Sequence, residues 1–199
     1  MGGSSNSGSG DPPLRGTRLF VAAPVPGYVK EALARLRDDR WNGFHWVGSG
    51  HYHLTLRFIG DVPGQFQGEI EAALEKVSVA PFFLPVEGVG RFPAKGSAHA
   101  VWAGLGSAHP RLFSLKKQIE DAFFRIGLEP EKRVYQPHLT IARVNHAAEE
   151  TVRQFLKEHA AFGAAPFRME MFGLYRSELR PEGRLHIEER TWAPGGVDG

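Results

Sequence analysis

The tripeptide His-Leu-Thr occurs twice in the chain, each time inside a short apolar run that alternates like a β-strand. The first copy lies in HYHLTLRFIG and the second in QPHLTIAR. Because the side chains of a strand alternate between its two faces, His53 and Thr55 share one face, and His138 and Thr140 do the same in the second copy. Each strand is therefore expected to have one core-like face and one polar face that carries a histidine and a threonine.

Apolar periodicity predicts four helices and seven strands, two of which carry the His-Leu-Thr copies. Each helix has a single apolar stripe, as a helix lying on a sheet should. The order helix, His-Leu-Thr strand, helix occurs twice, which is a weak internal repeat. We therefore predict an α+β fold of two pseudo-symmetric lobes, with mostly antiparallel sheet, helices on the outer faces and the active-site groove between the lobes. The expected helices are 27–39, 65–77, 110–126 and 149–159, and the expected strands are 17–23, 52–60, 82–89, 99–105, 135–144, 167–177 and 184–190.

Composition limits the classes of function. The chain has 199 residues and no cysteine, which excludes disulfides, a thiolate nucleophile and Cys-ligated zinc. A formal charge of +2 and a pI of about 9.0 suit an anionic partner. Residues 1–16 are rich in Gly, Ser and Pro and are expected to be a flexible linker, followed by a single domain over 17–199. With no apolar run long enough to cross a membrane, we expect a cytoplasmic monomer.

Two imidazoles suit a reaction in which one proton is removed while another is delivered. A histidine titrates near pH ~6.5, so one of the pair can be neutral as a base while the other is protonated as an acid. Threonine hydroxyls on the same faces can donate to the oxygens of a phosphate. Neither motif contains Asp or Glu, so we expect no metal and no cofactor. His51 and His53 could form a zinc pair, but a third ligand is not evident.

The two strands HLTLRFIG and PHLTIARV resemble the paired His-x-Thr signature of the two-histidine (2H) phosphoesterase superfamily. RLFVAAPVP, GVGRFP and LYRSEL resemble, in the same order, segments of the RNA 2′,3′-cyclic phosphodiesterases, also called 2′-5′ RNA ligase-like or LigT-like proteins. The likeness spans residues 17–192, nearly the whole folded chain. It implies that His53 and His138 are catalytic and that Thr55 and Thr140 bind the phosphate.

The resemblance also implies roles for two further residues. An arginine just after the second motif contacts the phosphate or nucleotide in the family, and an aromatic residue just after the first motif lies near the base. Arg143 and Phe58 occupy those positions. In regular strands, however, both residues would lie on the faces opposite to their histidines. A strand end or a β-bulge at that point would bring them back to the histidine face.

By this resemblance the chain is expected to hydrolyse the 2′,3′-cyclic phosphate at an RNA 3′ end, or on a nucleotide, to a 2′-phosphate without a metal. His53 is taken as the acid and His138 as the base, although the pseudo-symmetry also allows the opposite assignment. Reverse 2′-5′ RNA ligation is expected as a further activity of the same groups. One alternative is a related 2H phosphodiesterase that acts on 2′-5′ oligoadenylate or ADP-ribose cyclic phosphate. Another is a non-catalytic module that binds RNA ends, and a third is a zinc hydrolase.

Overall fold

The two His-Leu-Thr strands are neighbours in the middle of one sheet. The computed structural model describes residues 17–78, 80–180 and 183–193, and the predicted linker at residues 1–16 lies outside them. Within the described residues this sheet has the order β10-β9-β1-β3-β7-β6-β5, with β2 also paired to β7. Its strands are β1 (Thr17–Pro24), β2 (Phe44–Trp46), β3 (His53–Val62), β5 (Val89–Phe92), β6 (Ala100–Gly104), β7 (His138–Val144), β9 (Phe172–Arg180) and β10 (Gly183–Trp192).

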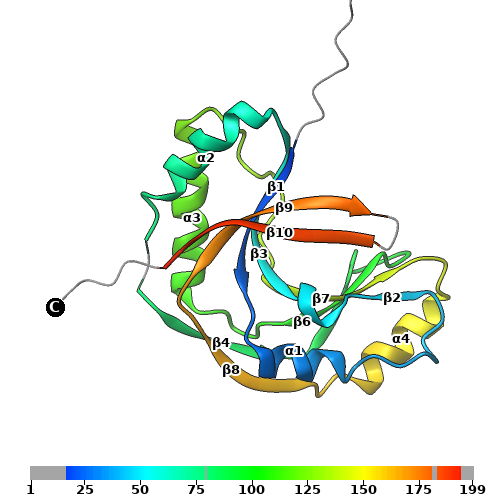
Figure 1. Ribbon diagram of the computed structural model, residues 1–199. Helices are drawn as coiled ribbons and strands as arrows, with labels where there is room; N and C mark the ends of the chain where they lie inside the picture. The colour runs from blue at the N-terminus through cyan, green and yellow to red at the C-terminus, as the bar shows by residue number, and fades with distance from the viewer. Residues whose placement is uncertain (1–16, 79, 181–182, 194–199) are drawn as a thin grey trace, which may run out of the picture.

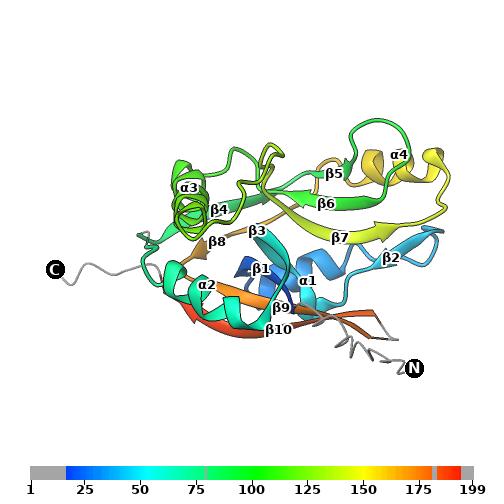
Figure 2. The same cartoon turned by 90° about the horizontal axis from the view of Figure 1, so that it is seen from above.

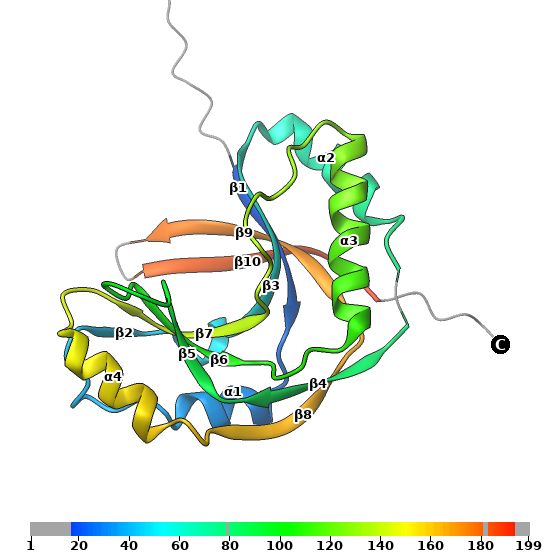
Figure 3. The same ribbon diagram turned by 180° about the vertical axis from the view of Figure 1, so that it is seen from behind.

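The pairing of β3 with β7 joins two halves of the molecule, and all the named strand pairs in both halves are antiparallel. A separate ribbon pairs β4 (Phe82–Glu87) with β8 (Gly163–Met169). Figures 1, 2 and 3 show α2 and α3 side by side at one end of the molecule and α4 at the other. The predicted α+β fold of two lobes with mostly antiparallel sheet is confirmed. The helices are α1 (Gly27–Ala34), α2 (Gln67–Leu74), α3 (Pro110–Arg125) and α4 (Glu149–Glu158).

Burial explains why these segments form these elements. β1 lies between β9 and β3, and its residues 19–23 are all buried, as expected for a strand covered on both faces. α3 begins where His109 Nδ1 accepts the backbone N–H of Arg111 at 3.1 Å, and it ends before Gly127, whose φ is 82°. Its apolar stripe belongs to a core cluster that also includes β3 and β7.

Besides shifts of a few residues at element ends, such as α2 ending at Leu74 and β7 beginning at His138, the structure differs from the predicted elements in three places. α1 ends at Ala34 because the next turn tightens, with Leu36 N–H bonding the carbonyl of Leu33, three residues back. The strands β2 and β5 were missed because they have only three and four residues. The segment 167–177 is not one strand: it pairs first with β4 and then with β1, so the chain changes partner between β8 and β9.

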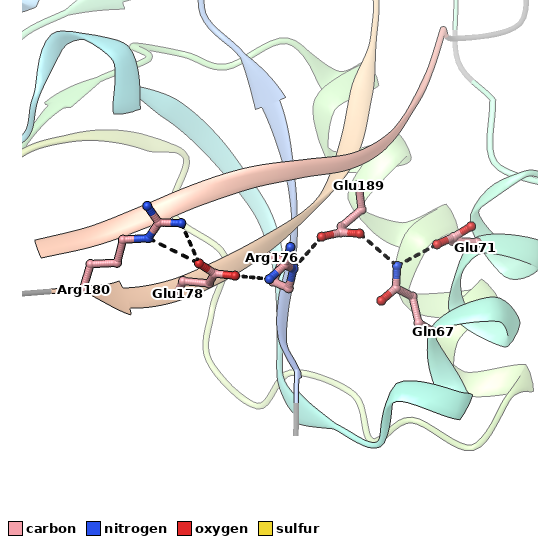
Figure 4. Close-up of polar contacts among 6 residues, drawn as sticks. All are labelled: Gln67, Glu71, Arg176, Glu178, Arg180 and Glu189. Atoms are coloured by element: carbon pink, nitrogen blue, oxygen red, sulfur yellow. Dashed lines mark hydrogen bonds and ion pairs between the residues drawn. The ribbon is translucent and has the colours of Figure 1, made fainter. Parts of the chain in front are cut away.

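A row of polar contacts fixes the β9–β10 hairpin against α2 (Figure 4). Arg176 pairs with Glu178 on its own strand and with Glu189 on β10, at 2.6 Å for the second contact. Gln67 at the start of α2 donates to Glu189 at 3.3 Å and to Glu71 at 2.9 Å. The outer hairpin is therefore bound to the helical layer by side chains as well as through the sheet.

Candidate active site

The site starts from a single pair of residues that joins the two halves. Leu54 of β3 lies opposite Leu139 of β7, and both side chains are fully buried. In an antiparallel pair, the residue before one leucine lies beside the residue after the other. His53 therefore lies toward Thr140, and Thr55 toward His138. All four polar side chains leave the face opposite to the leucines, so the two predicted polar faces form one surface.

A β-bulge follows each threonine. In the pairing of β3 with β1, Leu56 has no partner of its own, and in the pairing of β7 with β6 the same holds for Ile141. One extra residue reverses the alternation of faces downstream. Phe58 and Arg143 consequently return to the side of the histidines, where both are exposed. Strand alternation alone placed them on the core side, and the bulges remove that conflict.

The two histidines are held by the same backbone contact. His53 Nδ1 lies 2.7 Å from the carbonyl oxygen of His51, and His138 Nδ1 lies 2.8 Å from that of Gln136. Because a carbonyl oxygen only accepts hydrogen bonds, each Nδ1 carries the hydrogen and donates it. Each ring therefore keeps its Nε2 atom for proton exchange, and its orientation is fixed from behind.

His138 lies against two aromatic side chains of the second half. Its ring centroid is 4.8 Å from that of Phe92, edge to face, and 6.2 Å from that of Trp102. Burial lowers the pKa of His138 by removing solvent from the charged form; the backbone bond to Gln136 opposes this, and the positive charge of Arg143 adds to it. The free protein thus favours a neutral imidazole here.

His53 lies beside one aromatic ring and a second imidazole. Its ring lies 5.1 Å from Phe20 and 4.9 Å, edge to face, from His186. Burial is the main cause that lowers the pKa of His53; the backbone bond to His51 opposes it, and the charges of His138, His51 and Arg143 lower the pKa further.

The sequence did not indicate His186, which comes from β10. Its ring also lies 5.0 Å from Phe20 and 5.7 Å from His51. Within the described part of the chain its buried Nδ1 has no hydrogen-bond partner. Burial, followed by the charges of His53 and His51, lowers the pKa of His186 to about 4. Only the sheet order brings β10 to this place, so no local pattern around residue 186 could have revealed the contact.

A cavity of about 490 Å³ opens over the histidine surface, a volume within the usual range for small-molecule sites. It brings together five of the six residues singled out from the sequence, all except His53. Its lining also includes residues that the sequence did not indicate, among them Phe92, Arg133 and Tyr135. The five predicted residues in the lining are Thr55, Phe58, His138, Thr140 and Arg143.

A second hollow of about 500 Å³ lies over residues 37–46, around β2. Neither motif histidine nor either motif threonine lines it. Volume alone does not distinguish the two hollows, but only the first combines a half-buried, backbone-oriented histidine with hydroxyl donors and an arginine. We therefore place the candidate active site in the first cavity.

Buried contacts fix the walls of the site from beneath. Arg57 is 8% exposed, donates to the carbonyl oxygen of Phe58 at 2.5 Å and forms an ion pair with Glu120 at 3.0 Å. Tyr135 donates its hydroxyl to the carbonyl oxygen of Thr55 at 3.1 Å. The backbone at Thr55 and Phe58 is thereby held by side chains from other parts of the chain.

Across the residues that the structure describes, no three His, Asp or Glu side chains are arranged to hold a metal ion, and this includes His51, His53 and His186. No helix within the described ranges is long and apolar enough to cross a membrane.

Comparison with known proteins gives one consistent result. The model of the family "LigT like Phosphoesterase" matches residues 19–102 and 105–185. An RNA 2′,3′-cyclic phosphodiesterase of Aeropyrum pernix is 33% identical over 77% of this chain and 90% of that protein. A protein of the same name from Methanocaldococcus jannaschii is 26% identical over 88% of this chain and 99% of its own length.

A crystal structure of a Thermus thermophilus protein has the same fold. It superposes with a TM-score of 0.78 over 90% of this chain and 99% of that chain, at 24% sequence identity. The family model covers most of the chain, including both His-Leu-Thr strands and the β9–β10 hairpin up to residue 185. The chain belongs to the LigT-like phosphoesterase family.

Proposed function

We propose that the protein hydrolyses the 2′,3′-cyclic phosphate of an RNA 3′ end, or of a nucleotide, to a 2′-phosphate, and that the reaction needs no metal. The observation that carries the proposal is the pairing of the two motifs about Leu54 and Leu139, with both Nε2 atoms left for proton exchange. Membership of the LigT-like family and the activity named for the relatives support it.

In the proposed reaction, His138 Nε2 takes a proton from water as the water oxygen bonds to phosphorus. The bond from phosphorus to the 3′ oxygen breaks, and His53 Nε2–H protonates the leaving oxygen. The products are a 3′-hydroxyl and a 2′-phosphate. With a 5′-hydroxyl in place of water as the nucleophile, the same proton transfers would join two RNA ends through a 2′-5′ linkage and again release the 3′-hydroxyl.

The remaining predicted residues are assigned to the substrate. Thr55 and Thr140 donate their hydroxyls to the non-bridging oxygens, where charge grows in the transition state. Arg143 stabilises the same charge from the cavity wall, and Phe58 stacks on the base of the terminal nucleotide. The exposure of Phe58, 54% despite its apolar ring, supports a contact with a ligand rather than with the core.

Substrate binding is expected to supply the charge that the free site disfavours. The pKa values of His53 and His138 are both lowered before substrate binds, chiefly by burial. The negative phosphate favours an imidazolium beside it, so its arrival raises both pKa values and allows one ring to serve as acid. The other ring stays neutral, because two positive imidazoles around one phosphate repel each other.

The test is to incubate the protein with EDTA and either a 2′,3′-cyclic mononucleotide or a short RNA that ends in a cyclic phosphate, and to identify the products by ³¹P NMR. We expect a 2′-phosphate from both substrates. Parallel incubations with 2′-5′ oligoadenylate and ADP-ribose cyclic phosphate test the related activities. Absence of turnover on the first two substrates, or turnover that EDTA abolishes, would refute the proposal, and turnover of only the last two would replace it.

A further inference from the structure

We propose that Lys132 and Arg133 form a second phosphate site, which holds the phosphodiester that precedes the terminal nucleotide of an RNA substrate. This inference rests on the proposed function, because it assigns a substrate class to the same cavity. It makes an RNA end, rather than a cyclic mononucleotide, the preferred substrate.

The segment between α3 and β7 borders the cavity. Arg133 lines the same cavity as His138, Thr140 and Arg143, and its side chain is exposed. A cation at the rim of a cavity that already holds a phosphate-type site is well placed for the next phosphate of the same strand. Lys132 is its neighbour in sequence and is also exposed.

The charges of Lys132 and Arg133 are not neutralised by acidic neighbours among the described residues. Some exposed cations of this chain have an acidic partner, as Lys117 has in Asp121 at 2.5 Å. Among the described residues Lys132 and Arg133 have none within ion-pair distance. Glu131 also lines the cavity, but its carboxylate pairs with Lys116 at 3.0 Å. The rim therefore keeps the positive charge of Arg133 for a ligand, with Lys132 next to it in sequence.

The segment is anchored on both sides of the two cations. Before them, Arg57 donates to the carbonyl oxygen of Glu129, and Lys116 holds Glu131. After them, Tyr135 donates to the carbonyl oxygen of Thr55 at 3.1 Å. Arg57 and Lys116 are each only 8% exposed, so these anchors are partly shielded from solvent. A charged tip held in place loses less conformational entropy on binding than a free one.

The side chains at the tip of this segment, residues 132–134, are exposed and do not belong to the core. Val134, which follows the two cations, is 95% exposed although it is apolar. Buried groups thus hold in place a tip, residues 132–134, whose own side chains are all exposed and two of which, Arg133 and Val134, line the cavity. Such an arrangement is explained by binding at the cavity rim and not by folding.

A cyclic mononucleotide carries only the reacting phosphate and cannot use the second site. The experiment therefore measures kcat and KM for a cyclic mononucleotide and for a trinucleotide ending in a cyclic phosphate, over a range of KCl concentrations. The variants are K132A/R133A and, as a matched control, K76A/R125A, which removes two exposed cations outside the cavity lining. Thermal unfolding of each variant reports whether the fold is kept.

We expect the wild-type protein to prefer the trinucleotide, and K132A/R133A to lose about tenfold in kcat/KM on it, mainly through KM. The slope of log kcat/KM against log salt should become shallower by about 0.7 for one lost phosphate contact. Rates on the cyclic mononucleotide should stay within about twofold. The control pair should behave as wild type on both substrates.

Three results would overturn the inference: no preference for the trinucleotide in the wild-type protein, an equal loss on both substrates, or an unchanged trinucleotide KM in K132A/R133A. The first and third leave the proposed function standing, since the mononucleotide is still hydrolysed. If the wild-type protein turns over neither substrate, the proposed function fails. Fluorescence anisotropy with a 5′-labelled trinucleotide 2′-phosphate then tests the second site: tighter binding by wild type than by K132A/R133A supports it, and equal binding refutes it.

Discussion

His53 and His138 have matching backbones and unlike surroundings. Each donates Nδ1–H to the carbonyl two residues earlier, and a β-bulge follows the threonine of each motif. His138, however, lies beside Phe92 and Trp102, whereas His53 lies beside Phe20 and a second imidazole, His186. The repeated backbone fixes the position of each ring, and the neighbours that differ set how easily each ring takes a proton.

This difference bears on which ring is the acid. The repulsion between the two rings is mutual and Arg143 lowers both pKa values, so the charge of His51 is the one that lowers the pKa of His53 alone. In the free protein the balance of neighbours therefore favours charge on His138. The assignment of His53 as acid requires the bound phosphate to reverse that balance, which makes the comparison of the two halves open to experiment.

The largest expected effect comes from removing either ring. His53→Ala and His138→Ala should each lower kcat/KM on a cyclic phosphate by about 10² to 10⁴, the usual contribution of an acid or a base. The double variant should cost far less than the product of the two losses, because the rings act as one unit. Stopped-assay kinetics of the wild-type protein, the two single variants and the double variant measure kcat/KM. H45A, a change at an exposed histidine, is the control. Strictly multiplicative losses, or a large loss in H45A, would contradict a paired mechanism.

A smaller and sharper effect separates the two rings. A substrate with sulfur in place of the leaving 3′ oxygen needs less help from an acid, because a thiolate leaves more readily than an alkoxide. If His53 is the acid, this substrate should restore about 10² of the loss in His53→Ala and little in His138→Ala. Rates with the oxygen and sulfur substrates provide the comparison. Recovery in His138→Ala instead would reverse the two roles while leaving the pair intact.

The smallest effect concerns His186, which distinguishes the surroundings of His53. Its pKa of about 4 lies below the value of ~6.5 in an unfolded chain, so the unfolded state binds the proton first as the pH falls. The stability contributed by the neutral ring is present above pH ~6.5 and is lost as the pH falls toward 4. His186→Phe keeps a ring and removes the titration, so its Tm should fall less between pH 7 and 5, by about 1–3 °C. Equal falls in both proteins would show that His186 does not bury a neutral imidazole.

Much of this site could be predicted from alternation of residues along two short segments. The pattern of 51–60 and 136–143 placed histidine and threonine together on one face of each strand, and the structure places them there. The bulges at Leu56 and Ile141 could not be predicted, because the register with the neighbouring strands β1 and β6 creates them. For that reason the alternation put Phe58 on the wrong face.

Other features depend on contacts between segments far apart in the chain. His186 reaches His53 only through the order of strands in the sheet, and Tyr135 reaches Thr55 across 80 residues. The strand β2 is too short to show a period, and it is defined by its pairing with β7. Local patterns therefore predicted the histidines and threonines that we propose as the reacting groups, whereas the groups that orient and tune them required the tertiary structure.

The pH dependence of the rate tests the central claim, that two histidines of unlike surroundings act as one acid–base pair. Because one ring must be neutral and the other protonated, kcat/KM on a cyclic phosphate should follow a bell whose two limbs belong to the coupled pair. Burial lowers both pKa values in the free protein, and the bound phosphate raises them. Both limbs should therefore lie at lower pH in kcat/KM than in kcat. A flat profile, or a single rising limb like that of a metal-bound hydroxide, would contradict the two-histidine mechanism.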